Sequence, residues 1–278
     1  MSTLSQSYKE LAIPYFKEVF DIIDEIMIKH AVPYYLIGVN ALALELLKDG
    51  IKPGRGTKDI DFAIMISSFD EYEDISTSLQ KKDFNKVKAP WTFYSDKYNV
   101  AIDILPFGEV EERDTLKFNE RYSDLHVLGF KEILEDPEQV QIEEKIANIP
   151  PLPGMILLKL VAWSDRPEER GNDLADILKI IEHYFDYNFD EIVEHYNDTF
   201  SKDGFDHLLI AVEVLGRKSK KYLDKSNTLM ERIKTVLENN LNTEIESDIA
   251  KEWARIKNWE IEYAFSILKS FQKGINEY

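Results

Sequence analysis

Apolar residues recur at two different spacings in the first 106 residues, and this predicts helices alternating with strands. Between residues 15 and 30 they return every three or four positions, as on one face of an amphipathic helix. Short runs rich in β-branched and aromatic residues are typical of strands instead. The predicted elements are a helix over 15–30, a strand over 33–37, a helix over 41–48, a strand over 59–66, a helix over about 69–79, a strand beginning at 93–94 and a strand over 99–106 that ends at its proline.

The second half of the chain has a different pattern. After the segment PPLPG at 150–154, almost every stretch predicts helix, with breaks near 167–171, 188, 204 and 239–242. The proline cluster is the predicted domain junction. We therefore expect an α/β domain with a small mixed sheet over 1–150 and a mostly helical domain over 151–278.

Composition removes several classes of protein. Of the 278 residues, 44% are hydrophobic and 31% charged, a balance that supports a folded core and excludes disorder. The 34 Lys and Arg against 52 Asp and Glu leave a formal charge of −18, which repels nucleic acid unless a local patch overrides it. The chain has no cysteine, so disulfides, thiol nucleophiles and cysteine-ligated zinc are excluded, and any metal needs oxygen or imidazole ligands.

The sequence also predicts where the protein works. Its first apolar segment contains acids and follows no basic stretch, unlike a secretory signal. No run approaches the roughly 18–20 apolar residues of a membrane span. We expect a cytoplasmic protein without a membrane partner.

Three aspartates on two predicted strands carry the clearest chemistry. Asp59 and Asp61 are two residues apart, so their side chains point to the same strand face. If the strand over 99–106 lies beside theirs, Asp103 joins them and completes a site for Mg²⁺, with Mn²⁺ as the alternative. Such a D-x-D pair is also common on solvated strand ends. Here the acids lie in apolar strands, where unpaired charge is costly, which favours a metal site.

These residues resemble a known superfamily. LIGVNAL at 36–42, RGTKDIDF at 55–62 and IDI at 102–104 are similar in order and type to the nucleotidyltransferase core of the DNA polymerase β superfamily. MILLKLVAW at 155–163, DR at 165–166 and RGNDLADI at 170–177 resemble the K-L-x-A … D-R … K-D-x-x-D segment of AbiEii/AbiGii-type toxin nucleotidyltransferases. The resemblance covers roughly residues 30 to 185.

The resemblance implies an NTP substrate and a set of nucleotide-binding residues. Gly38, Val39 and Asn40 occupy the turn that would face the triphosphate, although the family prefers Gly or Ser where this chain has Val39. The backbone N–H groups at the following helix start suit phosphate whichever side chain is present. Arg55 and Thr57 would also contact phosphate, but Arg55 would equally suit a solvated turn.

The resemblance likewise implies that Lys159 contacts the triphosphate. It also implies that Asp173 helps to place either the Lys159 side chain or the nucleotide. From the residues alone, Lys159 fits the solvent-exposed face of its apolar helix better, because a buried ammonium is costly without an anion. Asp173 and Asp176 are three residues apart and would share a helix face. Both also suit a helix start, where acids interact favourably with the dipole.

The predicted function is Mg²⁺-dependent transfer of a nucleoside monophosphate to an acceptor hydroxyl by the toxin of a toxin–antitoxin or abortive-infection system. RNA such as tRNA is the expected acceptor, and an antitoxin protein is an expected partner. A basic island at 217–221 has two possible roles. It would bind RNA through phosphate contacts, or it would be an ordinary solvent-exposed helix face. The alternatives are a small-molecule transferase with an aminoglycoside-type acceptor and a non-catalytic nucleotide- or partner-binding module.

Overall fold

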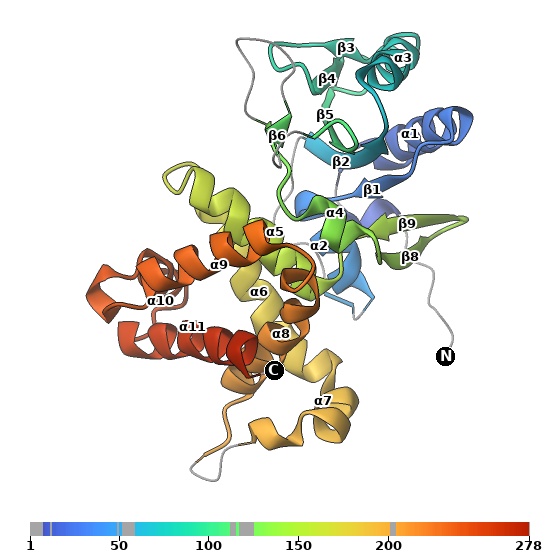
Figure 1. Cartoon of the computed structure of the whole chain (residues 1–278). Coiled ribbons are helices and arrows are strands. Elements are labelled where there is room, and N and C mark those ends of the chain that lie inside the picture. Colours follow the sequence, from blue (N-terminus) through green and yellow to red (C-terminus); the bar gives the residue numbers. More distant parts are fainter. Residues whose placement is uncertain are drawn as a thin grey trace. The chain divides into compact units, whose positions relative to one another are not determined.

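The computed structural model of the chain describes residues 8–11, 13–48, 50–51, 59–111, 115–116, 125–200 and 204–277. The chain divides into two compact units, Met1–Pro151 and Leu152–Tyr278. They are called here the N-terminal and the C-terminal unit, and Figure 1 shows the elements of both. The N-terminal unit mixes strands with helices, whereas the described part of the C-terminal unit is helical. The predicted fold class, α/β followed by helical, is confirmed.

A five-stranded sheet organises the N-terminal unit. β2 and β5 lie side by side near its middle and run parallel, while the remaining pairs are antiparallel. The sheet is therefore mixed, as the sequence predicts. In spatial order its strands are β1 (Tyr34–Leu36), β2 (Asp59–Ile66), β5 (Val100–Gly108), β4 (Thr92–Ser95) and β3 (Asn85–Lys86).

The prediction that Pro106 ends its strand is wrong, because β5 continues to Gly108. Ile104 donates its backbone N–H to Trp91, on the β4 side of the strand. Two residues later, the missing N–H of Pro106 falls on that same side, where β4 has already stopped pairing. Proline is tolerated there because no ladder hydrogen bond is lost.

Three helices of the N-terminal unit, α1 to α3, form close to their predicted ranges, whereas α4 has no counterpart in the sequence prediction. The amphipathic α1 buries Val19, Phe20 and Ile23, and the Phe20 ring lies 6.2 Å from that of Phe62 on β2. Ser68 caps α3 by accepting the Glu71 N–H at 3.3 Å. The helices are α1 (Phe16–His30), α2 (Gly38–Leu47), α3 (Phe69–Gln80) and α4 (Phe130–Leu134), preceded by the 3₁₀ turn η1 (Tyr8–Leu11).

Two small hairpins have no counterpart in the sequence prediction. β6 (Thr115–Leu116) pairs with β7 (Leu125–His126), and β8 (Glu138–Ile142) pairs with β9 (Lys145–Ile149). The β8–β9 turn contains Glu143 at φ 51°, a conformation usually signalled by Gly or Asn. Ion pairs from this turn to α1, such as Lys17–Glu144 at 2.7 Å, attach the hairpin to the rest of the unit. The β8–β9 turn therefore forms without the Gly or Asn that would have signalled it in the sequence.

The C-terminal unit is a bundle with short connections. Its helices are α5 (Leu152–Asp165), α6 (Gly171–Tyr187), α7 (Phe189–His195), α8 (His207–Leu223), α9 (Asn227–Asn240), α10 (Asp248–Lys257) and α11 (Ile261–Asn276), with 3₁₀ turns η2 (Asn197–Thr199) and η3 (Glu244–Glu246). Four helix breaks fall close to their predicted positions near 167–171, 188, 204 and 239–242, whereas the breaks at 224–226 and 258–260 have no counterpart in the sequence prediction.

Two glycines bring α8 and α11 into close contact. A Cβ on Gly216 would collide with the carbonyl oxygen of Phe271, and one on Gly274 with that of Glu213. The helix backbones therefore touch directly at this crossing, and any larger side chain would separate them.

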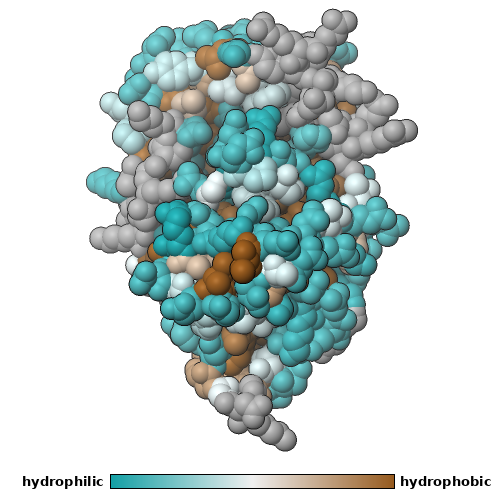
Figure 2. All heavy atoms as spheres, turned by 90° about the vertical axis from the view of Figure 1, so that its left-hand side faces the viewer, coloured by the Kyte–Doolittle hydropathy of each residue, from teal (hydrophilic) through white to brown (hydrophobic). Residues whose placement is uncertain are grey.

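Polar side chains dominate the molecular face drawn in Figure 2, where apolar ones form small separate patches. Among the described residues, no helix combines the length and hydrophobicity needed to cross a bilayer.

Candidate active site

Asp61 and Asp103 are paired directly across the parallel strands β2 and β5. Partners in register point to the same sheet face, and so does Asp59, two residues before Asp61. The condition set by the sequence analysis, that the two strands be neighbours, is therefore met. Asp59 is exposed, whereas Asp61 and Asp103 are half-buried. Three carboxylates thus share one face of the sheet.

Thr92 holds one oxygen of Asp103. This threonine is the register partner of Asp103 on β4, and its hydroxyl donates to Asp103 Oδ1 at 2.6 Å. The bond restrains the orientation of the carboxylate. No local sequence pattern indicates Thr92, because its only signal is its pairing with Asp103 across the strands.

The turn from β1 into α2 packs against the aspartate pair. Gly38 has φ +67°, and a Cβ there would collide with Asp61 Oδ2. Ile37 donates its N–H to the backbone carbonyl of Asp61 at 2.9 Å, and the buried Asn40 side chain donates to that of Asp59 at 3.1 Å. Gly38 is therefore required here for two reasons, its backbone conformation and the space that Asp61 occupies.

The α2 helix begins earlier than predicted. It starts at Gly38 instead of residue 41, so the N–H groups of its first turn belong to Gly38, Val39 and Asn40. These are the residues that the family resemblance places at the triphosphate. Since a backbone N–H is independent of the side chain, Val39 in place of Gly or Ser leaves this donor set intact.

The carboxylates supply only oxygen, which is the ligand type of Mg²⁺ and Mn²⁺. Their chemistry fits such an ion. Across the described ranges, however, no group of three His, Asp or Glu side chains is close enough together to hold a metal. Binding of one cation by all three aspartates would therefore require their side chains to move closer together.

Lys159 is buried in the C-terminal unit between two acids. Its ammonium lies 2.8 Å from Asp176 Oδ2 and 3.1 Å from Asp173 Oδ1, and Arg170 lies 3.6 Å from the other oxygen of Asp173. The expectation from the residues alone, that Lys159 is on an exposed helix face, is wrong. The acids compensate the desolvation that made burial improbable.

Electrostatics keep this lysine charged. Burial alone lowers the pKa of Lys159, but the attraction of Asp176 and Asp173 outweighs it and leaves the pKa above its ordinary value. Both acids project from one face of α6, as their three-residue spacing predicts. Asp176, which makes the shorter contact, was absent from the predicted site; its spacing from Asp173 was the available signal.

Two predicted residues lie outside the described part of the chain, namely Arg55 and Thr57. The remaining predicted residues fall into two groups. Gly38, Val39, Asn40 and the three aspartates belong to the N-terminal unit, whereas Lys159 and Asp173 belong to the C-terminal unit.

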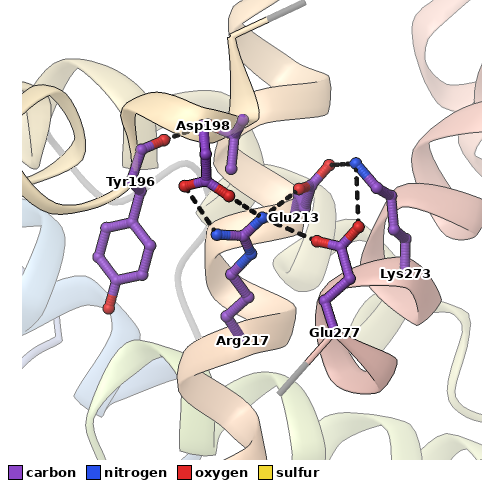
Figure 3. A network of polar contacts seen from close by, with 7 residues as sticks. Tyr196, Asp198, Glu213, Arg217, Lys273 and Glu277 are labelled. Carbon is purple, nitrogen blue, oxygen red and sulfur yellow. Dashed lines mark hydrogen bonds and ion pairs between the residues drawn. The ribbon is translucent and has the colours of Figure 1, made fainter.

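The basic island is not the continuous exposed patch that RNA binding would need. Arg217 is buried and forms ion pairs with Asp198, Glu213 and Glu277, at 2.7, 2.8 and 2.7 Å (Figure 3). Lys273 joins the same network through Glu213 at 2.8 Å. Hydrogen bonding to Asp198 raises the pKa of Arg217 and lowers that of the acid.

A second member of the island is also engaged within the unit. Lys218 lies 2.6 Å from Glu191 of α7. Arg217 and Lys218 thus tie α8 to neighbouring segments, and their first role is structural.

The chain is similar at low identity to several solved structures. An antigenic nucleotidyltransferase-like protein from Paracoccidioides brasiliensis is 15% identical, with 83% of this chain and 95% of that chain covered and a TM-score of 0.42. JHP933 from Helicobacter pylori is 14% identical, over 98% of this chain and 94% of that chain, with a TM-score of 0.35. The Elizabethkingia meningoseptica CdnE cyclic dinucleotide synthase with GTP and Apcpp is 12% identical, over 99% and 95%, with a TM-score of 0.31.

The sequence match to a family is more informative than these distant likenesses. No curated protein matches the chain. The pattern of the family described as "Nucleotidyl transferase AbiEii toxin, Type IV TA system" matches residues 42–264, which is most of the chain; the three aspartates and Lys159 lie within these bounds. The chain therefore belongs to the AbiEii toxin family of nucleotidyl transferases.

Proposed function

We propose that the chain moves a nucleoside monophosphate from an NTP to an acceptor hydroxyl, with Mg²⁺ or Mn²⁺ held by Asp59, Asp61 and Asp103. The observation that carries this proposal is the register pairing of Asp61 with Asp103, which sets three carboxylates on one sheet face. A bound divalent cation would neutralise triphosphate charge and stabilise the leaving oxygen.

The proposed reaction assigns each residue a separate task. The acceptor oxygen forms a bond to the α-phosphorus, the bond from that phosphorus to the bridging oxygen breaks, and pyrophosphate leaves. Asp103, restrained by Thr92, accepts the proton of the acceptor hydroxyl. The first N–H groups of α2 bind phosphate oxygens.

Lys159 contributes a fixed positive charge to the triphosphate in this proposal. An ammonium has three N–H donors, and Asp173 and Asp176 receive two of them. The acids orient the lysine in advance, so little reorganisation is needed when charge develops on the triphosphate. Asp173 and Asp176 are positioning residues in this scheme.

We propose RNA, such as tRNA, as the acceptor and an antitoxin protein as a partner, in keeping with a toxin family. A small cationic acceptor of the aminoglycoside type is the second candidate. Two observations favour the cationic acceptor over RNA: the formal charge of −18, and the ion pair that Arg217 forms with Asp198 of its own unit.

One labelling experiment separates these candidates. The purified chain is incubated with each α-labelled NTP, Mg²⁺ or Mn²⁺, and either total RNA or an aminoglycoside, with Asp61→Asn as the matched inactive control. Label on RNA supports the first acceptor, and label on the small molecule supports the second. Absence of metal-dependent label with every NTP and both acceptors would indicate a non-catalytic binding module.

A further inference from the structure

Large apolar side chains are exposed together at one place in the C-terminal unit. Phe189, Val193 and Phe205 have exposed fractions of 49%, 42% and 65%. Phe189 and Val193 are four residues apart on α7 and so share a face. The rings of Phe189 and Phe205 both lie against buried Phe185, at centroid distances of 5.7 and 5.5 Å. These three residues therefore belong to one exposed apolar patch.

The patch is held by an aromatic foundation. Phe185 meets Phe189 and Phe205 edge to face, at interplanar angles of 72° and 80°, and Phe200 stacks on Phe205 at 6.1 Å. Exposed phenyl rings restrained by their neighbours lose little further freedom on binding. Pre-ordered aromatic side chains of this kind are typical anchors of protein interfaces.

Acidic residues surround the aromatic ones along the chain. Segment 186–198 contains five acids and neither Lys nor Arg. Glu191 and Asp198 pair with Lys218 and Arg217 of α8. Asp190 and Glu194 are exposed, are four residues apart, and each follows an exposed apolar residue of α7. The apolar patch thus has a negative border on its own helix.

We propose that Phe189, Val193, Phe205, Asp190 and Glu194, called here the α7 surface, bind a basic segment of another protein. The segment would insert an apolar side chain against the phenyl rings, with lysine or arginine on either side to meet the acids. RNA is a poor occupant, because the acids repel phosphate. A second copy of this chain is also a poor occupant, because each copy carries −18.

The probe for this proposal is a synthetic amphipathic helical peptide made only of leucine and lysine. Its binding to the full chain is followed by fluorescence anisotropy. The test variant is Phe189→Ser/Phe205→Ser, and the control is Ile245→Ser, which alters a side chain 77% exposed elsewhere in the same unit. We expect at least about tenfold weaker binding in the test variant, about 1.4 kcal/mol, and unchanged binding in the control.

A charge pair of variants tests the acidic border separately. Asp190→Asn/Glu194→Gln removes two charges from the α7 surface, and Glu231→Gln/Glu238→Gln removes two exposed charges from α9. Only the first should weaken binding and flatten its salt dependence, since only those charges would contact lysine. If both variants weaken peptide binding equally, binding depends only on the net charge of the chain, and the proposal is overturned.

Two further outcomes would also contradict it. If the unaltered chain does not bind the peptide, the α7 surface is not a binding site for a basic segment. A self-association in sedimentation that disappears with Phe205→Ser would identify the occupant as a second copy. Phe205→Ser alone serves as the second variant if the double variant has a lower melting temperature, because its ring is mostly exposed. None of these measurements uses transferase activity, so they are independent of the proposed reaction.

Discussion

Asp61 of β2 and Asp103 of β5 are register partners in a parallel strand pair, so their side chains point to one face of the sheet. They come from positions 42 residues apart in the chain, and Asp59 joins them through strand alternation alone. This relationship is the basis of the first prediction.

Replacing any one aspartate with asparagine, as in Asp59→Asn, Asp61→Asn or Asp103→Asn, should lower turnover at least about a hundredfold, a loss comparable to removing one preorganised electrostatic contact. Removing one of several like charges should leave the metal-free melting temperature equal or slightly higher. Single-turnover rates and thermal melts check both statements. Full turnover in the three variants would exclude the carboxylate site.

Thr92→Val should raise the Mg²⁺ concentration needed for half-maximal turnover by roughly tenfold, because a second-layer hydrogen bond that orients a ligand typically contributes 10–100-fold. Thr92→Ser keeps the hydroxyl and serves as the control. A Mg²⁺ titration of the two variants and the natural chain gives the comparison. If serine and valine behave alike, the bond to Asp103 does not position that carboxylate.

Gly38→Ala should reduce both stability and turnover. Alanine at φ +67° costs roughly 1–2 kcal/mol from backbone strain, and its Cβ would also displace Asp61 Oδ2. Gly50→Ala is the matched control, since Gly50 has φ +78° but nothing within 4 Å of an added Cβ. Unfolding in urea should show a loss for both variants, whereas a catalytic loss is expected only for Gly38→Ala.

Lys159→Met should destabilise the C-terminal unit by about 3–5 kcal/mol, because it leaves the buried Asp176 without its cation and leaves the half-buried Asp173 with only Arg170. Lys159→Met combined with Asp173→Asn and Asp176→Asn removes that imbalance and should restore much of the stability. Turnover should stay at least about tenfold lower in the triple variant if the lysine contacts the triphosphate. A triple variant that regains both stability and turnover would make the ion pairs purely structural.

Asp198→Asn should lower the melting temperature at pH 7, and this difference should shrink as the pH falls below the ordinary aspartate pKa of about 3.9. Hydrogen bonding to Arg217 lowers the pKa of Asp198, so its contribution is present above the unfolded-state pKa and is lost as pH falls through the folded-state pKa. Thermal melts of both proteins across this range test the sign. A constant difference between them at every pH would show that the Asp198 carboxylate does not titrate through this contact.

Local patterns determined most of the helices and the central strands. The 3–4 residue apolar period in α1 and the two-residue alternation in β2 depend on neighbours along the chain, and strand alternation alone sets Asp59 and Asp61 on one face. Local patterns do not predict the β8–β9 turn. Glu143 has φ 51° there, in place of the Gly or Asn that usually signals such a turn.

Only the tertiary structure decided the contacts that join distant residues. Several contacts depend on which segments become neighbours. They are the pairing of Asp61 with Asp103, the hydrogen bond from Thr92 to Asp103, the end of β4 beside Pro106, the burial of Lys159 and the burial of Arg217 among acids. The sequence by itself determined which side chains a strand or helix presents on one face. It did not determine which charges would meet, because desolvation and pairing energies are set by partners from other elements and not by the local pattern.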